Sequence, residues 1–203
     1  MPTMEEAATR RELVRSGIAA TAVLSAAAVN SPRALAAVAP AQSDAAVLAR
    51  TLQIEQLVSI AYRQAIGSGA LGPTVIGPLR ALLSQELEHV ATLEHGLRGL
   101  GASVPAPPAG VASAQAALVR HHVFASLTRL RTQHECLRLL IDVESLAEGA
   151  YFSAISKLSD PGLLRTSTEI MGCEAQHWTL LSALQHHGNV DRAVPYPFVQ
   201  GSS

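Results

Sequence analysis

The sequence predicts an all-α protein, a four-helix bundle made of two duplicated antiparallel helical hairpins that are joined by a long crossover. Apolar residues make up 48% of the 203 residues and aromatic residues only 3%. The core must therefore be built from alanine, leucine, valine and isoleucine, a mixture that favours helices over sheets. Helical apolar patterns alternate with segments rich in glycine and proline, and the second half of the chain repeats features of the first.

The first hairpin is expected between a helix start at Ser43 and Asp44 and a helix end at Gly101. Its first helix begins at the N-cap candidates Ser43 and Asp44 and ends near Ile66, where a glycine-rich loop follows. Pro73 then starts a second helix, which ends at Gly101. A proline-rich connector separates this hairpin from the rest of the chain.

The second hairpin follows the same plan. A helical pattern returns at about Ser113 and runs to Leu158, with an expected break near Ser126. Asp160 is an N-cap candidate that precedes a proline at the first position of the last helix, and Gly188 ends that helix. The connector is long enough to recross the bundle, so the two hairpins can pack with equivalent residues at one level.

Residues 1–36 are typical of an export signal. The basic stretch TRRELVR, Thr9 to Arg15, precedes the apolar run Gly17 to Val29, which is too short for a comfortable membrane span. The arginine pair indicates the twin-arginine route; an ordinary secretory signal is the alternative. Small residues at Ala-x-Ala spacing predict cleavage after Ala36 and a mature protein in the periplasm, the cell envelope or the medium. The expected parts are the signal at 1–36, the bundle at 43–188 and an irregular tail at 189–203.

The internal repeat aligns residues with metal-binding chemistry. The aligned pairs, 88 or 89 positions apart, are Glu55 with Glu144, Tyr62 with Tyr151, Glu86 with Glu174 and His89 with His177. In each hairpin the two glutamates are equidistant from the turn. At the α-helical rise, the glutamates of one hairpin therefore face each other roughly 23 Å from that turn.

Four carboxylates and two imidazoles are thus expected to meet inside the bundle. The spacing Glu-x-x-His puts both side chains on one helix face. Four buried glutamates without counter-charge would be costly, whereas two divalent cations balance them and imidazole completes the coordination. One glutamate from each of two helices and Glu-x-x-His from the other two is the ligand pattern of di-iron and di-manganese carboxylate bundles. The duplication predicts that His89 and His177 are nearly equivalent, each binding one ion.

With these residues the chain resembles the ferritin-like superfamily over about residues 43–188. It resembles the bacterioferritin and rubrerythrin branch, and in particular the exported bacterial ferritin-like domain proteins. The resemblance implies that Glu55 and Glu144 are terminal ligands and that Glu86 and Glu174 are bridging ligands. It also implies that His89 and His177 each bind one ion. Tyr62 and Tyr151 would each form a hydrogen bond with a ligand carboxylate across the bundle.

The resulting hypothesis is an exported oxidoreductase with two iron ions that reacts with O₂ or peroxide, or oxidises Fe²⁺. A dimanganese catalase-like enzyme stays open because these ligand types do not choose between the metals. A metal-free interaction module of the cell envelope is the alternative from another class. A net charge of −1 gives no electrostatic case for nucleic acid. The oligomeric state stays open, a homodimer included.

Several reactive side chains are expected to stand outside this site. With no C-x-x-C motif, Cys136 and Cys173 are interpreted as buried free thiols. Surface positions, or positions beside the ligands, are expected for Glu88, Glu94 and Glu148, and surface or helix-end positions for His95, His121, His122, His134, His186 and His187.

Overall fold

The computed structural model describes residues 43–194. The expected export signal at residues 1–36 and the part of the tail after residue 194 lie outside the described residues. Within the described part, no helix combines the length and the apolar character that a membrane crossing requires.

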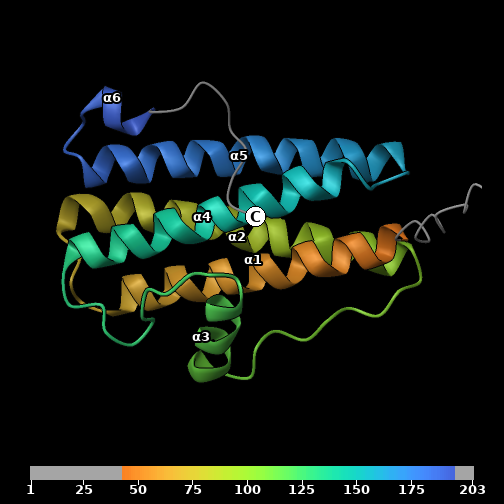
Figure 1. Cartoon of the computed structure of the whole chain (residues 1–203), viewed down its shortest axis with the longest axis horizontal. Helices are drawn as coiled ribbons and strands as arrows, with labels where there is room; N and C mark the ends of the chain where they lie inside the picture. The colour runs from red at the N-terminus through yellow and green to blue at the C-terminus, as the bar shows by residue number, and fades with distance from the viewer. Residues whose placement is uncertain (1–42, 195–203) are drawn as a thin grey trace, which may run out of the picture. The chain divides into compact units, whose positions relative to one another are not determined.

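The described residues are helical and contain no strand, which confirms the all-α prediction. In chain order the helices are α1 Asp44–Gly67, α2 Pro73–Gly99, α3 Val111–Arg120, α4 Gln133–Ile155, α5 Pro161–Gln185 and α6 Val190–Ala193. The four long helices run side by side, and α3 lies within the crossover between the two pairs (Figure 1). We call α1 with α2 the first hairpin, and α4 with α5 the second hairpin.

Helices α1, α4 and α5 begin where the sequence supplies a capping side chain, whereas α2 begins at Gly72 and Pro73 without one. The side chain of Ser43 accepts a hydrogen bond from the backbone N–H of Ala46 at the start of α1. Asp160 does the same at α5, followed by proline at the first helical position. At α4, which the sequence reasoning did not delimit, Thr132 forms a capping box with Glu135.

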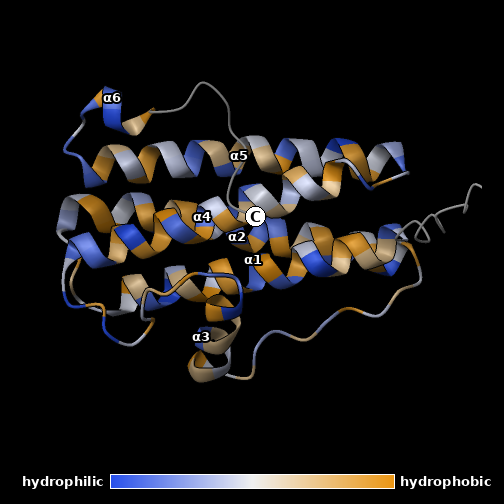
Figure 2. Cartoon of the chain, viewed as in Figure 1, coloured by the Kyte–Doolittle hydropathy of each residue, from blue (hydrophilic) through white to orange (hydrophobic). Residues whose placement is uncertain are grey.

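The hairpins pack through α1 and α4, while α2 and α5 approach each other over only a short stretch. Hydrophobic residues occur along all four long helices (Figure 2). They form two clusters, one that includes Val58 and Leu140 and another that includes Leu52 and Leu97. A layer of buried polar residues lies where the two clusters meet, so the core surrounds this layer from both ends of the bundle.

Each hairpin turn is held by the first residue of the other hairpin. The carboxylate of Asp44, at the start of α1, accepts hydrogen bonds from the backbone N–H groups of Ser159 and Asp160 at 2.9 Å. At the other turn, the side-chain oxygen of Gln133, at the start of α4, accepts one from the N–H of Gly72 at 3.0 Å. These contacts fix the height of one hairpin against the other.

Two expectations need correction. The third helical pattern does not run on from Ser113: α3 ends at Arg120 and residues 121–132 are not helical, so the break expected near Ser126 is a whole segment. The side chain of Gln115 holds this segment by hydrogen bonds with the backbone of Ala125 and Leu127. The tail, expected to be irregular from residue 189, begins with the single turn α6, which Asn189 caps.

Candidate metal centre

The polar layer at the middle of the bundle consists of the residues that the repeat singled out. Glu55 comes from α1, Glu86 and His89 from α2, Glu144 from α4, and Glu174 and His177 from α5. All six side chains are buried, and the four glutamates are 0% exposed. The structure therefore brings together every residue that the sequence predicted as a ligand.

These six residues form two overlapping groups. The His89 group contains Glu55, Glu86, His89 and Glu174, and the His177 group contains Glu86, Glu144, Glu174 and His177; within each, one ligand atom per residue lies within 4.8 Å of the others. Only Glu86 and Glu174 belong to both groups. The role of a ligand that bridges two ions stays a prediction for these two shared residues.

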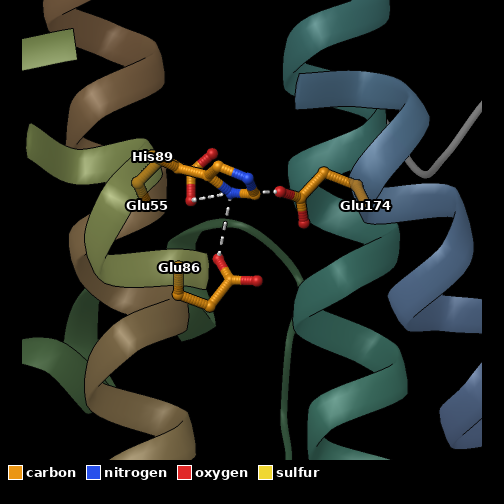
Figure 3. A group of neighbouring side chains, drawn as sticks. All are labelled: Glu55, Glu86, His89 and Glu174. Carbon is orange, nitrogen blue, oxygen red and sulfur yellow. Dashed lines mark ion pairs between the residues drawn. The ribbon is translucent and has the colours of Figure 1, made fainter. Parts of the chain in front are cut away.

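Both histidines direct Nδ1 into the centre. His89 Nδ1 lies 2.8 Å from Glu174 Oε1, 3.7 Å from Glu86 Oε2 and 4.0 Å from Glu55 Oε2 (Figure 3). His177 Nδ1 lies 2.6 Å from Glu86 Oε1 and 3.5 Å from Glu144 Oε1. The two rings stack with their centroids 5.9 Å apart. The nitrogen atoms that face the carboxylates are thus the ones available to a metal.

The two tyrosines cross from one hairpin to the other. The hydroxyl of Tyr62 on α1 donates to Glu144 on α4, and the hydroxyl of Tyr151 on α4 donates to Glu55 on α1. In both glutamates the tyrosine takes Oε1 and leaves Oε2 without a hydrogen bond. The reciprocal pair agrees with the duplicated hairpins and with the contacts expected for Tyr62 and Tyr151.

Without a metal, burial favours the protonated form of most glutamates in the centre. Burial is the main cause that raises the pKa of Glu55, Glu144 and Glu174 well above the usual range, and repulsion by neighbouring carboxylates adds to it. Burial acts on Glu86 too, but the close approach of His177 and His89 outweighs it and lowers its pKa to about 2. Burial would lower the pKa of His89, yet contacts with Glu174 and Glu86 raise it to about 9. A bound cation must displace these protons.

The inward-facing atoms provide a test of whether the residues suit a metal. His177 Nδ1 and Glu86 Oε1 form a close ion pair, yet neither atom has a hydrogen-bond partner. Every ligand candidate has at least one buried atom without a hydrogen-bond partner. These atoms are Glu55 Oε2, both oxygens of Glu86, His89 Nδ1, Glu144 Oε2, both oxygens of Glu174 and His177 Nδ1. Buried polar atoms without partners are costly. Oxygen and imidazole nitrogen donors suit divalent iron, manganese or zinc, so the donor set fits a dinuclear site.

A protein-family model for the ferritin-like domain matches residues 43–187. The chain belongs to the ferritin-like family. The match covers both hairpins and the crossover, which agrees with the four-helix arrangement. Neither the search of curated proteins nor the search of solved structures gave a match. The ferritin-like fold and its buried glutamate and histidine cluster are therefore established, and metal binding by the cluster stays a prediction.

Residues predicted to stand outside the centre do so, with refinements. The other six histidines are at most half-buried and join neither group: His95, His121, His122, His134, His186 and His187. Glu148 joins neither group, but it is only 5% exposed, and burial raises its pKa to about 7. Both cysteines are free; Cys136 is buried, whereas Cys173 is only half-buried.

Sequence reasoning missed the surroundings of His177. Its Nε2 atom lies 2.7 Å from the side-chain oxygen of Gln85 and 3.3 Å from the sulfur of Cys173. The alignment of the two halves contains the signal that could have found them, because Gln85 and Cys173 occupy equivalent positions one turn before a histidine. The two histidines therefore differ in their hydrogen bonds, although the repeat predicts near-equivalent roles for them.

Proposed function

We propose that this ferritin-like protein holds two iron ions between its hairpins and is an oxidoreductase that acts on O₂, peroxide or Fe²⁺. The observation that carries the proposal is the pair of overlapping four-residue groups that share Glu86 and Glu174. Such sharing supports two cations side by side, because two separate mononuclear sites would need no common ligand.

The ligands divide between the two ions. Glu55 with His89 would hold one ion, Glu144 with His177 the other, and the shared glutamates would hold both. Bound iron would supply the electron-transfer chemistry toward oxygen species.

The protein's part is to position donors and to exclude water. Tyr62 and Tyr151 each fix one carboxylate oxygen and leave the other for the metal. Leu52, Val58 and Leu140, each 0% exposed, belong to the apolar clusters that meet at the layer. Such a surrounding keeps bulk water from the reacting atoms and strengthens electrostatic interactions inside the site.

Metal analysis tests this proposal most directly. Protein matured in its own host, or the metal-free protein loaded anaerobically with Fe(II), is expected to contain about two ions per chain, as a four-glutamate, two-histidine set requires. Substantially less than one ion per chain after loading would refute the proposal in favour of a metal-free module. Two manganese ions with peroxide disproportionation would instead support the catalase-like alternative.

Export is a second part of the proposal and rests on the TRRELVR stretch. Replacing both arginines by lysine, Arg10→Lys with Arg11→Lys, is expected to leave the protein in the cytoplasm, because the twin-arginine route depends on that pair. Cell fractionation with antibody detection of the mature protein measures this. Unchanged delivery outside the cytoplasm would show that the pair is incidental.

A further inference from the structure

The two histidines of the centre differ on the side that faces away from the carboxylates. His177 Nε2 lies 2.7 Å from Gln85 Oε1 and 3.3 Å from Cys173 Sγ, and the sulfur itself lies 3.7 Å from Gln85 Oε1. Within residues 43–194, His89 Nε2 forms no hydrogen bond. The imidazole of His89 is also the more exposed, at 10% against 2% for His177.

The difference follows from one unlike pair of residues in the repeat. Gln85 stands one turn before His89 on α2, and Cys173 stands one turn before His177 on α5. A perfect repeat would give each histidine the same two neighbours. The long side chain of Gln85 reaches across from α2 to the histidine on α5, whereas the short side chain of Cys173 does not reach His89. Both residues therefore serve one histidine.

The contact also determines which ring nitrogen carries the proton. An amide oxygen only accepts hydrogen bonds, so His177 must donate to it from Nε2–H. The thiol of Cys173 donates to the same oxygen, which agrees with that orientation of the amide. With Nε2 held by Gln85, Nδ1 is the nitrogen that loses its proton and offers a lone pair when a metal binds, and it faces Glu86 and Glu144. A hydrogen bond to the outer nitrogen fixes the tautomer and raises the basicity of a metal-binding histidine.

We propose that Gln85, with Cys173, positions His177 so that the two metal positions are unequal. The position in the His177 group binds its ion first and more tightly, and the position in the His89 group holds the second, exchangeable ion. This inference rests on the proposed dinuclear site and extends it. Gln85 and Cys173 are positioning residues, since they act through His177 and not as ligands themselves.

Stepwise metal binding tests the inference. Metal-free protein is titrated anaerobically with Co(II) in a calorimeter, and the two steps are assigned with His89→Ala and His177→Ala. Wild-type protein is expected to show a tight and a weak step. Gln85→Leu removes the acceptor at nearly constant size and is expected to weaken the tight step by about 10- to 100-fold, the usual effect of losing such a partner. Gln85→Glu retains an acceptor and is expected to keep the step tight.

Two controls separate positioning from a general structural effect. Gln176→Leu makes the same change at an exposed glutamine adjacent to His177 in the sequence, and it is expected to leave both steps unchanged. The melting temperature of metal-free Gln85→Leu is expected to match that of the wild type, because Gln85 is largely exposed.

Exchanging the two residues gives the sharpest result. Gln85→Cys combined with Cys173→Gln is expected to transfer the tight step from the His177 position to the His89 position. Equal steps in the wild type, or an unaltered tight step in both Gln85→Leu and the exchanged variant, would overturn the inference while leaving the dinuclear site intact. Wild-type protein that binds no Co(II) at all would overturn the proposed function, and the inference with it.

Discussion

The two hairpins carry the same ligands in different surroundings. Each supplies one lone glutamate, one Glu-x-x-His pair and one tyrosine that reaches the other hairpin. They differ one turn before the histidine, where the first hairpin has Gln85 and the second has Cys173. The comparison teaches that matched ligands do not make matched surroundings: the donors of a duplicated centre can be identical while the hydrogen bonds behind them differ, and we propose that this difference makes the two metal positions unequal.

The largest expected effect comes from the two glutamates that both groups share. Glu86→Gln or Glu174→Gln keeps the size of the side chain but removes a ligand from both positions, so both ions should be lost. Glu55→Gln or Glu144→Gln should cost one ion each. Metal content after anaerobic loading and gel filtration checks this. Two ions retained in the Glu86→Gln variant would show that this residue does not bridge.

Removing a histidine should cost one ion, and the affinity of the ion that is lost should differ between the two hairpins. His177→Ala should lose the tightly held ion and His89→Ala the weakly held one, with turnover reduced in both because the proposed reaction needs two ions. His95→Ala is the control, since His95 is exposed on the same helix as His89. Circular dichroism should show an intact bundle in all three variants. Loss of metal from His95→Ala with retention in His89→Ala would contradict the ligand assignment.

The starts of α1, α2 and α5 and the six ligand candidates could be predicted because they depend on local, periodic information. Capping residues such as Ser43 and Asp160 mark helix starts in the sequence, and the repeat pairs each glutamate with its equivalent. The crossover could not be read in the same way. Val123, Leu127 and Leu130 are buried at helix-like spacing although residues 121–132 are not helical. These residues are buried because the irregular segment packs on the core. Hydrophobic spacing alone does not distinguish such a segment from a helix.

The residues behind the ligands were harder to predict for a different reason. Gln85 is exposed on α2, and a polar residue at such a position is typical of a solvated helix face. Its role depends on the approach of α5, a tertiary fact that no local pattern contains. Glu148 is similar: it lies one turn after Glu144, and only the packing of the helices around α4 decides that it is buried.

The pH dependence of stability should differ between metal-free and metal-loaded protein. Groups with raised pKa values stabilise the metal-free fold fully below their unfolded pKa, and this contribution is lost as pH rises toward the folded pKa. For His89 the window runs from the ordinary 6.5 to about 9. For Glu55 it begins at the ordinary 4.5. The lowered pKa of Glu86 acts in the opposite sense, but only as pH falls from 4.5 through about 2.

Metal-free protein should therefore become less stable as pH rises above 4.5 toward about 9, while metal affinity increases because fewer protons must be displaced. The rise in melting temperature on adding Mn(II) should grow across this range. Thermal melts with and without metal at several pH values measure it. A rise that is the same at every pH would mean that protons and metal do not compete for the centre.

The tyrosines should have a smaller effect, and each should act on a different ion. Tyr62→Phe removes the donor to Glu144 and should weaken the ion of the His177 group, whereas Tyr151→Phe should weaken the ion of the His89 group through Glu55. About a tenfold loss of affinity is expected for each, at the low end for a residue that orients a ligand. Stepwise titration identifies the affected step. Phe152→Leu, at an exposed residue beside Tyr151, is the control. Equal weakening of both steps by one tyrosine would contradict the cross-hairpin pairing.

The smallest effect is expected at the turns, where each hairpin uses a different residue to accept hydrogen bonds from the turn of the other. Asp44 accepts from both Ser159 and Asp160, and the backbone hydrogen bond from Ser159 is the main cause of its lowered pKa. Gln133 accepts from Gly72 with a neutral oxygen. A charged acceptor forms the stronger hydrogen bond. Asp44→Asn should therefore lower the melting temperature by more than Gln133→Leu, and neither should change metal content.

Acid pH provides the check on this last comparison. A group with a lowered pKa contributes stability above its ordinary value, here 3.8, and the contribution is lost as pH falls through the folded pKa. Wild-type and Asp44→Asn proteins should therefore converge in melting temperature as the solution is acidified, whereas the difference made by Gln133→Leu should not depend on pH in this way. A constant gap for Asp44→Asn would mean that the shape of this side chain, and not its charge, ties the second turn to the start of α1.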